Sequence, residues 1–430
     1  MGEAVGVGLI GLGVVGSGVV RALAERGEYF ARQVGAPIVV RRAAVRDPAK
    51  PRNAPIDPAL ITADVDSLLA DPAIQVVIEV MGGEEPAHRY VRQALEAGKH
   101  VVTANKELMA KRGPELLALA RERGCYLLFE ASVGGGIPLI APLRRDLLAN
   151  RIASVRAIIN GTTNYILTRM AQEGADYAEA LAEAQRLGYA EPDPTNDVEG
   201  YDAAYKLAVL ATLAFRTRVA PEQIRTEGIT RLSARDFLYA AELGYVIKLV
   251  AVAERRDRGL LARVAPVLLH RDEPLAKVDG VYNAVQIVGD LTGMVLFEGR
   301  GAGAEPTASA VIADLLEIAE AVVHRVPNRA AWSPEEELPI LGPEEIENRY
   351  YIRVTVADRP GVLARLAKCL GDNDVSIAAV NQKEANEDQQ TAELVIMTHR
   401  ARESAVLKAL AEIAELPVVS EVSTFLRVEE

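Results

Sequence analysis

Cysteine, histidine and long apolar runs are scarce in this chain of 430 residues, and each scarcity excludes a class of protein. The two cysteines, Cys125 and Cys369, lie far apart and form no CxxC pair, which argues against a disulfide framework or a zinc site. The five histidines are scattered without metal-ligand spacing. No apolar run reaches the roughly 18 residues of a membrane span, and the chain opens directly with a predicted strand rather than a signal peptide. We therefore expect a cytoplasmic protein.

Basic residues are outnumbered by acidic ones, and the net charge is −12. This balance argues against nucleic acid or an anionic membrane as the main partner, so any anionic ligand must be attracted by a local group of Lys and Arg. Half of the residues are hydrophobic and a quarter are charged, as in a soluble globular protein. The length suffices for two or three domains with cores of their own.

The N-terminus contains a glycine fingerprint in a specific context. Val5–Ile10 (VGVGLI) predicts a strand, GLGVVG follows at once, and the next residues predict a helix. This order is typical of a dinucleotide site, in which the glycines allow a tight turn, close approach to a pyrophosphate, and packing of helix on strand. The cofactor-binding residues predicted here are Gly11, Gly13, Val14, Val15 and Gly16.

The end of the second predicted strand, Pro37–Val45, bears on which nicotinamide cofactor is bound. A site for NAD usually places a carboxylate here for the ribose hydroxyls. Arg46 comes first in this chain and would pair with a 2′-phosphate, which favours NADP(H), while Asp47 keeps NAD(H) open. A solvated loop charge is the other interpretation of Arg46.

Further strands, Gln75–Val80, His100–Thr103 and Cys125–Glu130, alternate with helices and so predict a parallel sheet with ligands beyond its carboxyl edge. Asn105 and Lys106 come directly after one of these strands. A lysine in the first turn of a helix opposes the helix dipole, so a bound anion or a reacting oxygen would explain it. Glu130 and the following GGG turn offer a carboxylate and exposed carbonyls to a hard cation; a flexible corner is the alternative.

The stretch from Leu187 to Lys206, LGYAEPDPTNDVEGYDAAYK, contains the strongest candidate for a reaction site. Asp202 and Lys206 lie at i and i+4 of a predicted helix, so they share one face. The helix continues as KLAVLATLAF, which predicts burial. A lysine there can lose its proton near neutral pH, which suits acid–base chemistry. The alternative is an ordinary helical salt bridge worth about 0.3–0.5 kcal/mol.

The same stretch is crowded with acidic residues. An EF-hand calcium loop is excluded because Val198 occupies the position that needs glycine. Glu191 and Asp202 flank the loop and would hold a substrate ammonium group, whereas a solvated loop explains the other carboxylates equally well. A second glycine loop, GRGAGAEPT, precedes a predicted helix over Thr307–Val323 and favours contact with a phosphate or cofactor.

The C-terminal residues read β-α-β-β-α-β, a ferredoxin-like pattern. Their first turn, DRPGVL (358–363), resembles the turn of ACT domains, which commonly bind amino acids between paired copies. We therefore predict an α/β protein. Its parts are a Rossmann-type parallel sheet in 1–150 plus 304–325, an inserted α+β catalytic and dimerisation domain in 151–303, a linker in 326–348, and an ACT domain in 349–430 with regulatory residues Asp358, Gly361 and Leu363. A purely oligomerising role for the ACT domain stays open.

The order of these motifs resembles homoserine dehydrogenase over essentially the whole chain. The matching strings are GLGVVGSGVV, VTANKELMA, FEASVGGGIPLI, NGTTNYIL, LGYAEPDPTNDVEGYDAAYK and GRGAGAEPTASAV. That family reduces L-aspartate 4-semialdehyde to L-homoserine with NADPH or NADH, in threonine, methionine and isoleucine biosynthesis. The resemblance implies that Lys206 is the acid–base residue, that Lys106 lies by the reacting centre and the cofactor, and that Glu191 and Asp202 bind substrate.

The resemblance also implies further sites. Gly188 and Gly303 would contact cofactor, as would Asn105, and a sodium site would be formed by Glu130 with the backbones of Val133, Gly135 and Ile137. The protein would be a homodimer or homotetramer, and threonine would inhibit it through the ACT domain. Two other functions stay open: a different Rossmann oxidoreductase acting on an amino-acid carbonyl, and a non-catalytic amino-acid sensor.

Overall fold

The protein divides into two compact units, each built from several segments of the chain. The structure, a computed structural model, describes residues 2–328, 334–386 and 390–429. The first unit contains Met1–Val155, Tyr205–Ile224 and Tyr282–Glu337, and the second contains Arg156–Ala204, Arg225–Val281 and Leu338–Glu430. Among the described residues, no helix is both long and apolar enough to cross a membrane. Residues 329–333 of the predicted linker lie outside the described residues.

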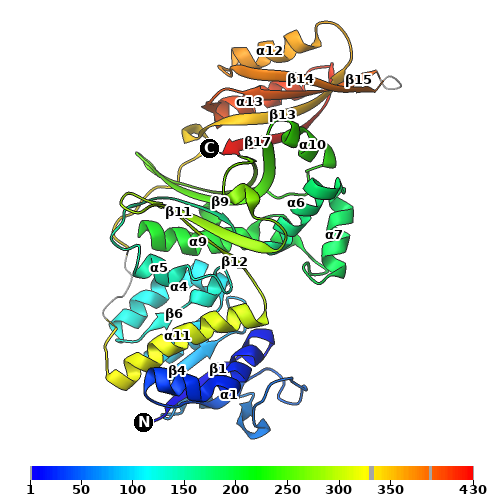
Figure 1. The fold of residues 1–430 in the computed structure, drawn as a ribbon. Helices are drawn as coiled ribbons and strands as arrows, with labels where there is room; N and C mark the ends of the chain where they lie inside the picture. Colours follow the sequence, from blue (N-terminus) through cyan, green and yellow to red (C-terminus); the bar gives the residue numbers. More distant parts are fainter. Residues whose placement is uncertain (1, 329–333, 387–389, 430) are drawn as a thin grey trace. The chain divides into compact units, whose positions relative to one another are not determined.

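A six-stranded parallel sheet, of which Figure 1 labels β1, β4 and β6, forms the centre of the first unit. Its strands follow the order β3-β2-β1-β4-β5-β6. This is the strand order of a dinucleotide-binding fold, with its switch point between β1 and β4, so the predicted Rossmann-type sheet is confirmed. The strands are β1 Val5–Ile10, β2 Ile38–Ala44, β3 Ile61–Thr62, β4 Val76–Glu79, β5 His100–Thr103 and β6 Leu127–Leu128.

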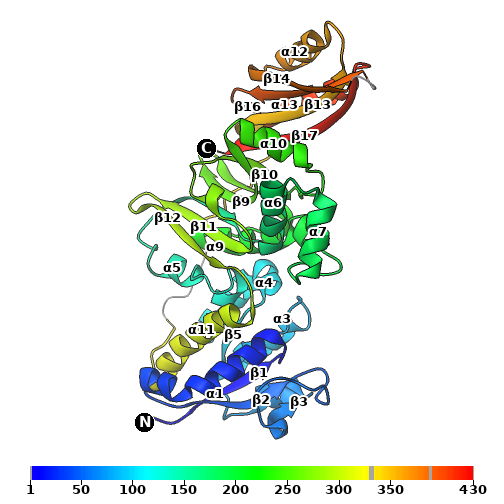
Figure 2. The ribbon, with the colours of Figure 1, turned by 45° about the vertical axis from the view of Figure 1, so that its right-hand side comes forward.

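Two long helices, α1 (Val14–Val34) and α11 (Ala304–His324), pack side by side against this sheet (Figure 2). Their inward faces, with Val19, Leu23, Val311 and Leu315, form one apolar core with β1 and β4. The helix predicted to return from the far end of the middle region therefore completes the first unit. The other helices of this unit are α2 Val65–Ala70, α3 Ala87–Glu96, α4 Lys106–Glu122 and α5 Ile140–Arg144.

Two further pieces of the predicted middle domain belong to the first compact unit. Most of α9 (Tyr201–Phe215) is one of them, and its residues from Tyr205 onward count with this unit. The other is an antiparallel hairpin of β11 (Tyr282–Gly289) and β12 (Gly293–Arg300). The turn between them is short because Gly293 adopts a positive φ of 70°, which glycine tolerates.

The second unit is organised on a sheet that runs without interruption from the middle region into the C-terminal region. Its strands follow the order β9-β10-β17-β13-β15-β14, with β8 on β10 and β16 on β13. Their bounds are β8 Arg225–Thr226, β9 Tyr245–Arg256, β10 Gly259–His270, β13 Glu347–Ala357, β14 Ile377–Asn386, β15 Thr391–Thr398, β16 Ala401–Arg402 and β17 Val419–Glu429. β7 (Ile152–Ile158) begins in the first unit and ends in the second.

The C-terminal region has the predicted β-α-β-β-α-β order, with strands arranged β17-β13-β15-β14. Alternate residues of β13, including Tyr350, Ile352 and Val354, face a core under α12 (Val362–Asp372) and α13 (Glu403–Ala414). The helices of the middle region in this unit are α6 Gly161–Glu173, α7 Tyr177–Arg186, α8 Thr195–Val198 and α10 Ala234–Glu242.

This region is joined to the rest of its unit by backbone pairing. β17 pairs in parallel with β10, with Val267 opposite Arg427 and Leu269 opposite Glu429. Part of the predicted linker is fixed as well, because the Leu260 amide donates to the Pro339 carbonyl at 2.8 Å and the Leu341 amide donates to the Leu260 carbonyl at 2.9 Å. The boundaries of the two compact units therefore differ from the predicted domain boundaries. The predicted domains stay a prediction.

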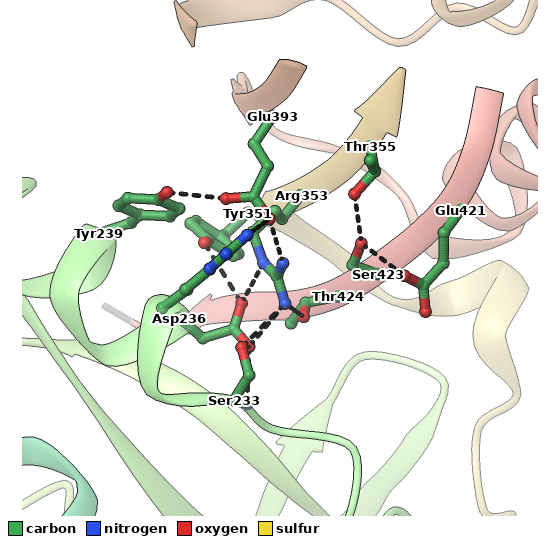
Figure 3. Close-up of polar contacts among 11 residues, drawn as sticks. Ser233, Asp236, Tyr239, Tyr351, Arg353, Thr355, Glu393, Glu421, Ser423 and Thr424 are labelled. Carbon is green, nitrogen blue, oxygen red and sulfur yellow. Dashed lines mark hydrogen bonds and ion pairs between the residues drawn. The ribbon is translucent and has the colours of Figure 1, made fainter. Parts of the chain in front are cut away.

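Buried charged side chains also join the C-terminal region to α10. They lie on the face of β13 opposite the apolar core (Figure 3). Arg353 donates from Nε to Asp236 Oδ1 of α10 at 2.8 Å, from Nη2 to Asp236 Oδ2 at 3.1 Å, and from Nη1 to Glu393 Oε1 at 2.8 Å. Tyr239 adds a bond to Glu393 Oε2 at 2.7 Å. Burial alone would raise the pKa of Glu393, but hydrogen bonds from Tyr239 and Arg235 and the charge of Arg353 lower it.

Replacement of Arg353 tests this attachment. Arg353→Met would leave two carboxylates buried without their shared cation, so we expect a loss of about 3–5 kcal/mol in unfolding free energy at pH 7. The pKa of Glu393 is lower in the folded protein than in the unfolded chain. The contribution of Glu393 to the unfolding free energy is therefore complete at pH values above its pKa in the unfolded chain, and it is lost as the pH falls through its pKa in the folded protein.

Urea denaturation of the wild type and the variant at pH 7 and pH 4 measures both effects. Lys368→Ala is the control, since the Lys368–Asp372 pair on α12 is exposed and should matter little. An Arg353→Met protein as stable as the control would show that the cluster does not hold the region in place.

Candidate active site

A cavity of about 250 Å³ lies in the first unit, at the carboxyl edge of its sheet. Glycine turns and two lysines line it, which gives a small space with cationic groups and little side-chain bulk. The lining residues are Gly82, Gly83, Ala104, Asn105, Lys106, Glu107, Ala131, Ser132, Gly134, Gly135, Lys206, Gly301, Ala302 and Thr307. Of the predicted site residues, the structure brings Asn105, Lys106, Gly135 and Lys206 together here.

Asn105 and Lys106 reach the cavity because a strand ends just before them. β5 ends at Thr103, and the Asn105 side chain caps α4 by accepting from the Leu108 amide at 3.0 Å. Asn105 Nδ2 also donates to the Gly83 carbonyl at 2.7 Å, which ties the cap to the turn after β4. Lys106 is the first residue of α4 and is half-buried. The predicted lysine in a first helical turn therefore borders a cavity.

Lys206 enters the same cavity from α9. The predicted helix is present as Tyr201–Phe215, and it is apolar and buried beyond Lys206, whose own side chain is half-buried. Asp202, one turn earlier, belongs to the second unit, where its buried carboxylate accepts from Asn160 Nδ2 at 2.9 Å.

Asn160 is a residue that the sequence analysis missed. It caps α6 through a bond from the Thr163 amide at 2.8 Å, and its Nδ2 also donates to Asp197 Oδ1 at 2.7 Å. The signal was present in NGTTNYIL, where the asparagine precedes the threonines. Glu191, the other predicted substrate-binding carboxylate, is exposed in the same unit.

The glycine fingerprint has the expected turn. Gly11 has a φ of 103°, open only to glycine at low cost, and its amide donates to the Ala44 carbonyl at 2.9 Å. A methyl group on Gly16 would lie 2.3 Å from the Gly11 carbonyl oxygen, whereas one on Gly13 would meet no atom within 4 Å. Val15 is half-buried, while Val14, the first residue of the 21-residue helix α1, is 72% exposed.

The other predicted cofactor residues lie at several places. Arg46 is exposed just after β2. Gly303, with a φ of 125°, caps α11 next to the cavity residue Ala302. Gly188 belongs to the second unit and has a φ of 78° with no neighbour for an added methyl group.

The carboxylate of Glu130, the predicted side-chain ligand of a sodium ion, accepts hydrogen bonds from backbone amides. Glu130 Oε1 accepts from the amides of Leu139 at 2.5 Å and Ile140 at 2.9 Å, and Oε2 accepts from Ala141 at 2.7 Å. The carboxylate is therefore occupied in holding the start of α5. Gly134 and Gly135, in the turn that contains the predicted backbone ligands, have φ of 77° and 58°, which glycine adopts at low cost. Within the described ranges, no group of three or more His, Cys, Asp or Glu gathers as a metal site.

A buried carboxylate next to the cavity was also missed. Glu79 ends β4 with no exposure, and it accepts from Thr103 Oγ1 at 2.6 Å and from the Met81 amide at 2.8 Å. Burial raises its pKa, although hydrogen bonds from Thr103 and Met81 lower it. The sequence signal was a glutamate inside the apolar run VVIEV, where a strand residue must be buried.

The predicted regulatory turn opens the first helix of the C-terminal region. Gly361 has a φ of 85° and precedes α12, and Leu363 is 45% exposed. The Asp358 amide donates to the Gln390 carbonyl at 2.8 Å, and its Oδ1 accepts from Gln382 Nε2 at 3.3 Å.

Three family models match the chain in the order of these parts. "Homoserine dehydrogenase, NAD binding domain" matches residues 11–130, "Homoserine dehydrogenase" matches 138–316, and "ACT domain" matches 350–418. A homoserine dehydrogenase of Pseudomonas aeruginosa is 44% identical, over 100% of this chain and 99% of its own.

Solved structures agree with these matches. A homoserine dehydrogenase of Thiobacillus denitrificans has a TM-score of 0.91 at 43% identity, covering 100% of this chain and 99% of its own. A hyperthermophilic archaeal homoserine dehydrogenase in complex with NADPH has a TM-score of 0.62 at 28% identity, covering 73% of this chain and 97% of its own.

Substitution of Gly13 separates cofactor binding from folding. Gly13→Ala adds a methyl group where the protein has room for it, but the group would stand between the amides of α1 and a pyrophosphate. We expect an unchanged melting temperature and at least about tenfold weaker binding of reduced nicotinamide cofactor, or ~1.4 kcal/mol.

Fluorescence titration and thermal melting measure the two quantities. Gly27→Ala is the matched control, because Gly27 lies within α1 and likewise has no neighbour within 4 Å. Equal affinity in both variants would remove Gly13 from the cofactor site.

Proposed function

Because the chain belongs to the homoserine dehydrogenase family, we propose that its reaction takes place in the glycine-lined cavity, with Lys206 as the proton donor. The chain is an NAD(P)-dependent oxidoreductase that reduces L-aspartate 4-semialdehyde to L-homoserine. The observation that carries the proposal is that Lys106 and Lys206, from two different helices, line one small cavity at the carboxyl edge of the sheet. Ligands of open α/β sheets bind at this edge.

The chemistry requires a cation at the aldehyde oxygen. The nicotinamide cofactor supplies the hydride when bound, and negative charge then develops on that oxygen. An ammonium group held in place can donate a proton to the oxygen and stabilise the charge as it forms. We assign the proton donation to Lys206. Lys106 would hold the oxygen or the carboxamide region of the cofactor, a role supported by its place directly after β5.

The substrate also carries an ammonium group, which needs an acceptor. Asp202 and Glu191 are assigned to it, and Asp202 is the better supported because its carboxylate is buried and already oriented by Asn160.

We also propose which nicotinamide cofactor and which metal ion the protein binds. NADP(H) is favoured by Arg46 and by the NADPH complex of the archaeal relative, while Asp47 leaves NAD(H) open. Sodium would be held by Glu130 with the backbones of Val133, Gly135 and Ile137, and it would supply charge that fixes the turn beside the cavity.

We also propose how the protein assembles and how it is regulated. A homodimer or homotetramer is supported by apolar side chains exposed on the β11–β12 hairpin, namely Tyr282, Leu291 and Met294. Threonine inhibition through Asp358, Gly361 and Leu363 is supported by the match of residues 350–418 to the ACT family. The cytoplasmic location stays a prediction from the sequence.

Steady-state assays with L-aspartate 4-semialdehyde and each reduced cofactor test the activity and the proton donor. Lys206→Ala should lower kcat by about 10²–10⁴-fold with cofactor binding little changed. Lys206→Arg keeps a cation that does not give up its proton at neutral pH, so it should stay strongly impaired. Lys277→Ala, an exposed lysine in another part of the chain, is the control. Near-normal turnover of Lys206→Ala would refute the assignment.

The regulatory proposal predicts that threonine lowers the activity of the wild-type protein and raises its melting temperature, since a ligand that binds only the folded state stabilises it. Asp358→Ala should lose both responses and keep its basal turnover. If threonine changes neither quantity in the wild type, the C-terminal region is structural or binds something else.

A further inference from the structure

The buried carboxylate beside the cavity has no part in the chemistry described above. Glu79 follows three apolar residues of β4, and it lies opposite Thr103 in the parallel ladder of β4 and β5. Both residues have no solvent exposure. An ionisable group in such a place carries a large desolvation penalty, so its presence calls for specific hydrogen bonds and a reason to keep them.

Those hydrogen bonds run from Glu79 to the cavity wall. Thr103 Oγ1 donates to Glu79 Oε2 at 2.6 Å and accepts from the Asn105 amide at 3.0 Å. Asn105 in turn bonds the Gly83 carbonyl and caps α4. On the other side, Glu79 Oε1 accepts from the Met81 amide at 2.8 Å, which fixes the start of the turn that contains Gly82 and Gly83.

Glu79 is therefore bonded to both segments that frame one side of the cavity. One is the turn with Gly82 and Gly83, and the other is the helix start with Asn105 and Lys106, all four of which line the cavity. We infer that Glu79, acting through Thr103 and Asn105, is a positioning residue that holds Lys106 and the glycine turn in register for the reaction. The inference rests on the proposed function, because it requires the reaction to occur in this cavity.

If Glu79 had a purely structural role, its replacement would lower the stability of the protein without a specific loss of turnover. A second buried charged group next to the same two strands serves as the control. At the opposite end of β4 and β5, the buried Lys99 Nζ donates to the carbonyls of Asp71 and Ile74, both at 2.7 Å. This group also joins loops at the end of the ladder, but it precedes β5, whereas the lining residues Ala104, Asn105 and Lys106 follow that strand. Lys99→Met is therefore the matched control for removing a buried charged group from this sheet.

The experiment uses the full-length protein with four substitutions: Glu79→Gln, Thr103→Val, Thr103→Ser and Lys99→Met. Glu79→Gln keeps the shape but replaces one acceptor oxygen by a donor. Thr103→Val keeps the volume and removes the hydroxyl group that joins Glu79 to Asn105. Thr103→Ser retains that hydroxyl group. Melting temperature, kcat and KM are measured for each variant, well below its melting temperature.

We expect Glu79→Gln and Thr103→Val to lower kcat by about 10- to 100-fold, because a displacement of about 1 Å at a reacting centre has effects of this size. KM should change much less, and Thr103→Ser should recover most of the turnover. Lys99→Met should lower the melting temperature and leave kcat near the wild-type value.

Other results would overturn the inference. Unchanged kcat in both Glu79→Gln and Thr103→Val, or the same loss of kcat in Lys99→Met, would make the cluster a stability device only. The same conclusion would follow if neither Glu79→Gln nor Thr103→Val folded. Absence of activity in the wild type would instead contradict the proposed function itself, so the two failures are distinguishable.

Discussion

The parallel pairing of β4 with β5 is the constraint on which the proposed site depends. It sets Glu79 directly opposite Thr103, so that a carboxylate and a hydroxyl group meet inside the sheet at the point where both strands end. The chain then has to leave each strand by a turn, and both turns take their hydrogen bonds from this pair. Carboxyl ends of parallel strands form one edge, which brings Gly82, Gly83, Asn105 and Lys106 to a common cavity.

The second unit obeys a comparable constraint. Three residues of β17 pair with β10, and Arg353 bonds the two carboxylates Asp236 and Glu393 out of water. A region attached by a continuous sheet and a buried ion cluster cannot rotate freely about a linker. Any rearrangement within it must be compatible with β10, because packed cores change between discrete arrangements rather than deforming gradually.

Much of this could be predicted from local sequence. Periodicity and glycine placement were sufficient for β1, β5, α9 and the C-terminal β-α-β-β-α-β pattern, because each is specified by residues near in the chain. Glu79 was missed because its partner Thr103 lies 24 residues away, and a pairing register cannot be deduced from one strand. The attachment of β17 to β10 is non-local in the same way.

Because the chain is acidic overall, the binding of an anionic cofactor depends on the positive groups close to the cavity. A protein with a net charge of −12 repels an anionic cofactor at long range, so attraction must come from groups close to the binding edge. Three helices of the first unit, α1, α4 and α11, begin after glycine turns or an asparagine cap, and helix N-termini favour anions. Of these, α4 begins at the cavity lining and α11 begins close to the lining residue Ala302. Lys106 and Lys206 add full positive charges there. Because helix dipoles act only within about the first turn, the exact placement of these helix starts decides whether an anion is held, and the hydrogen bonds from Glu79 to Thr103 and onward fix one of them.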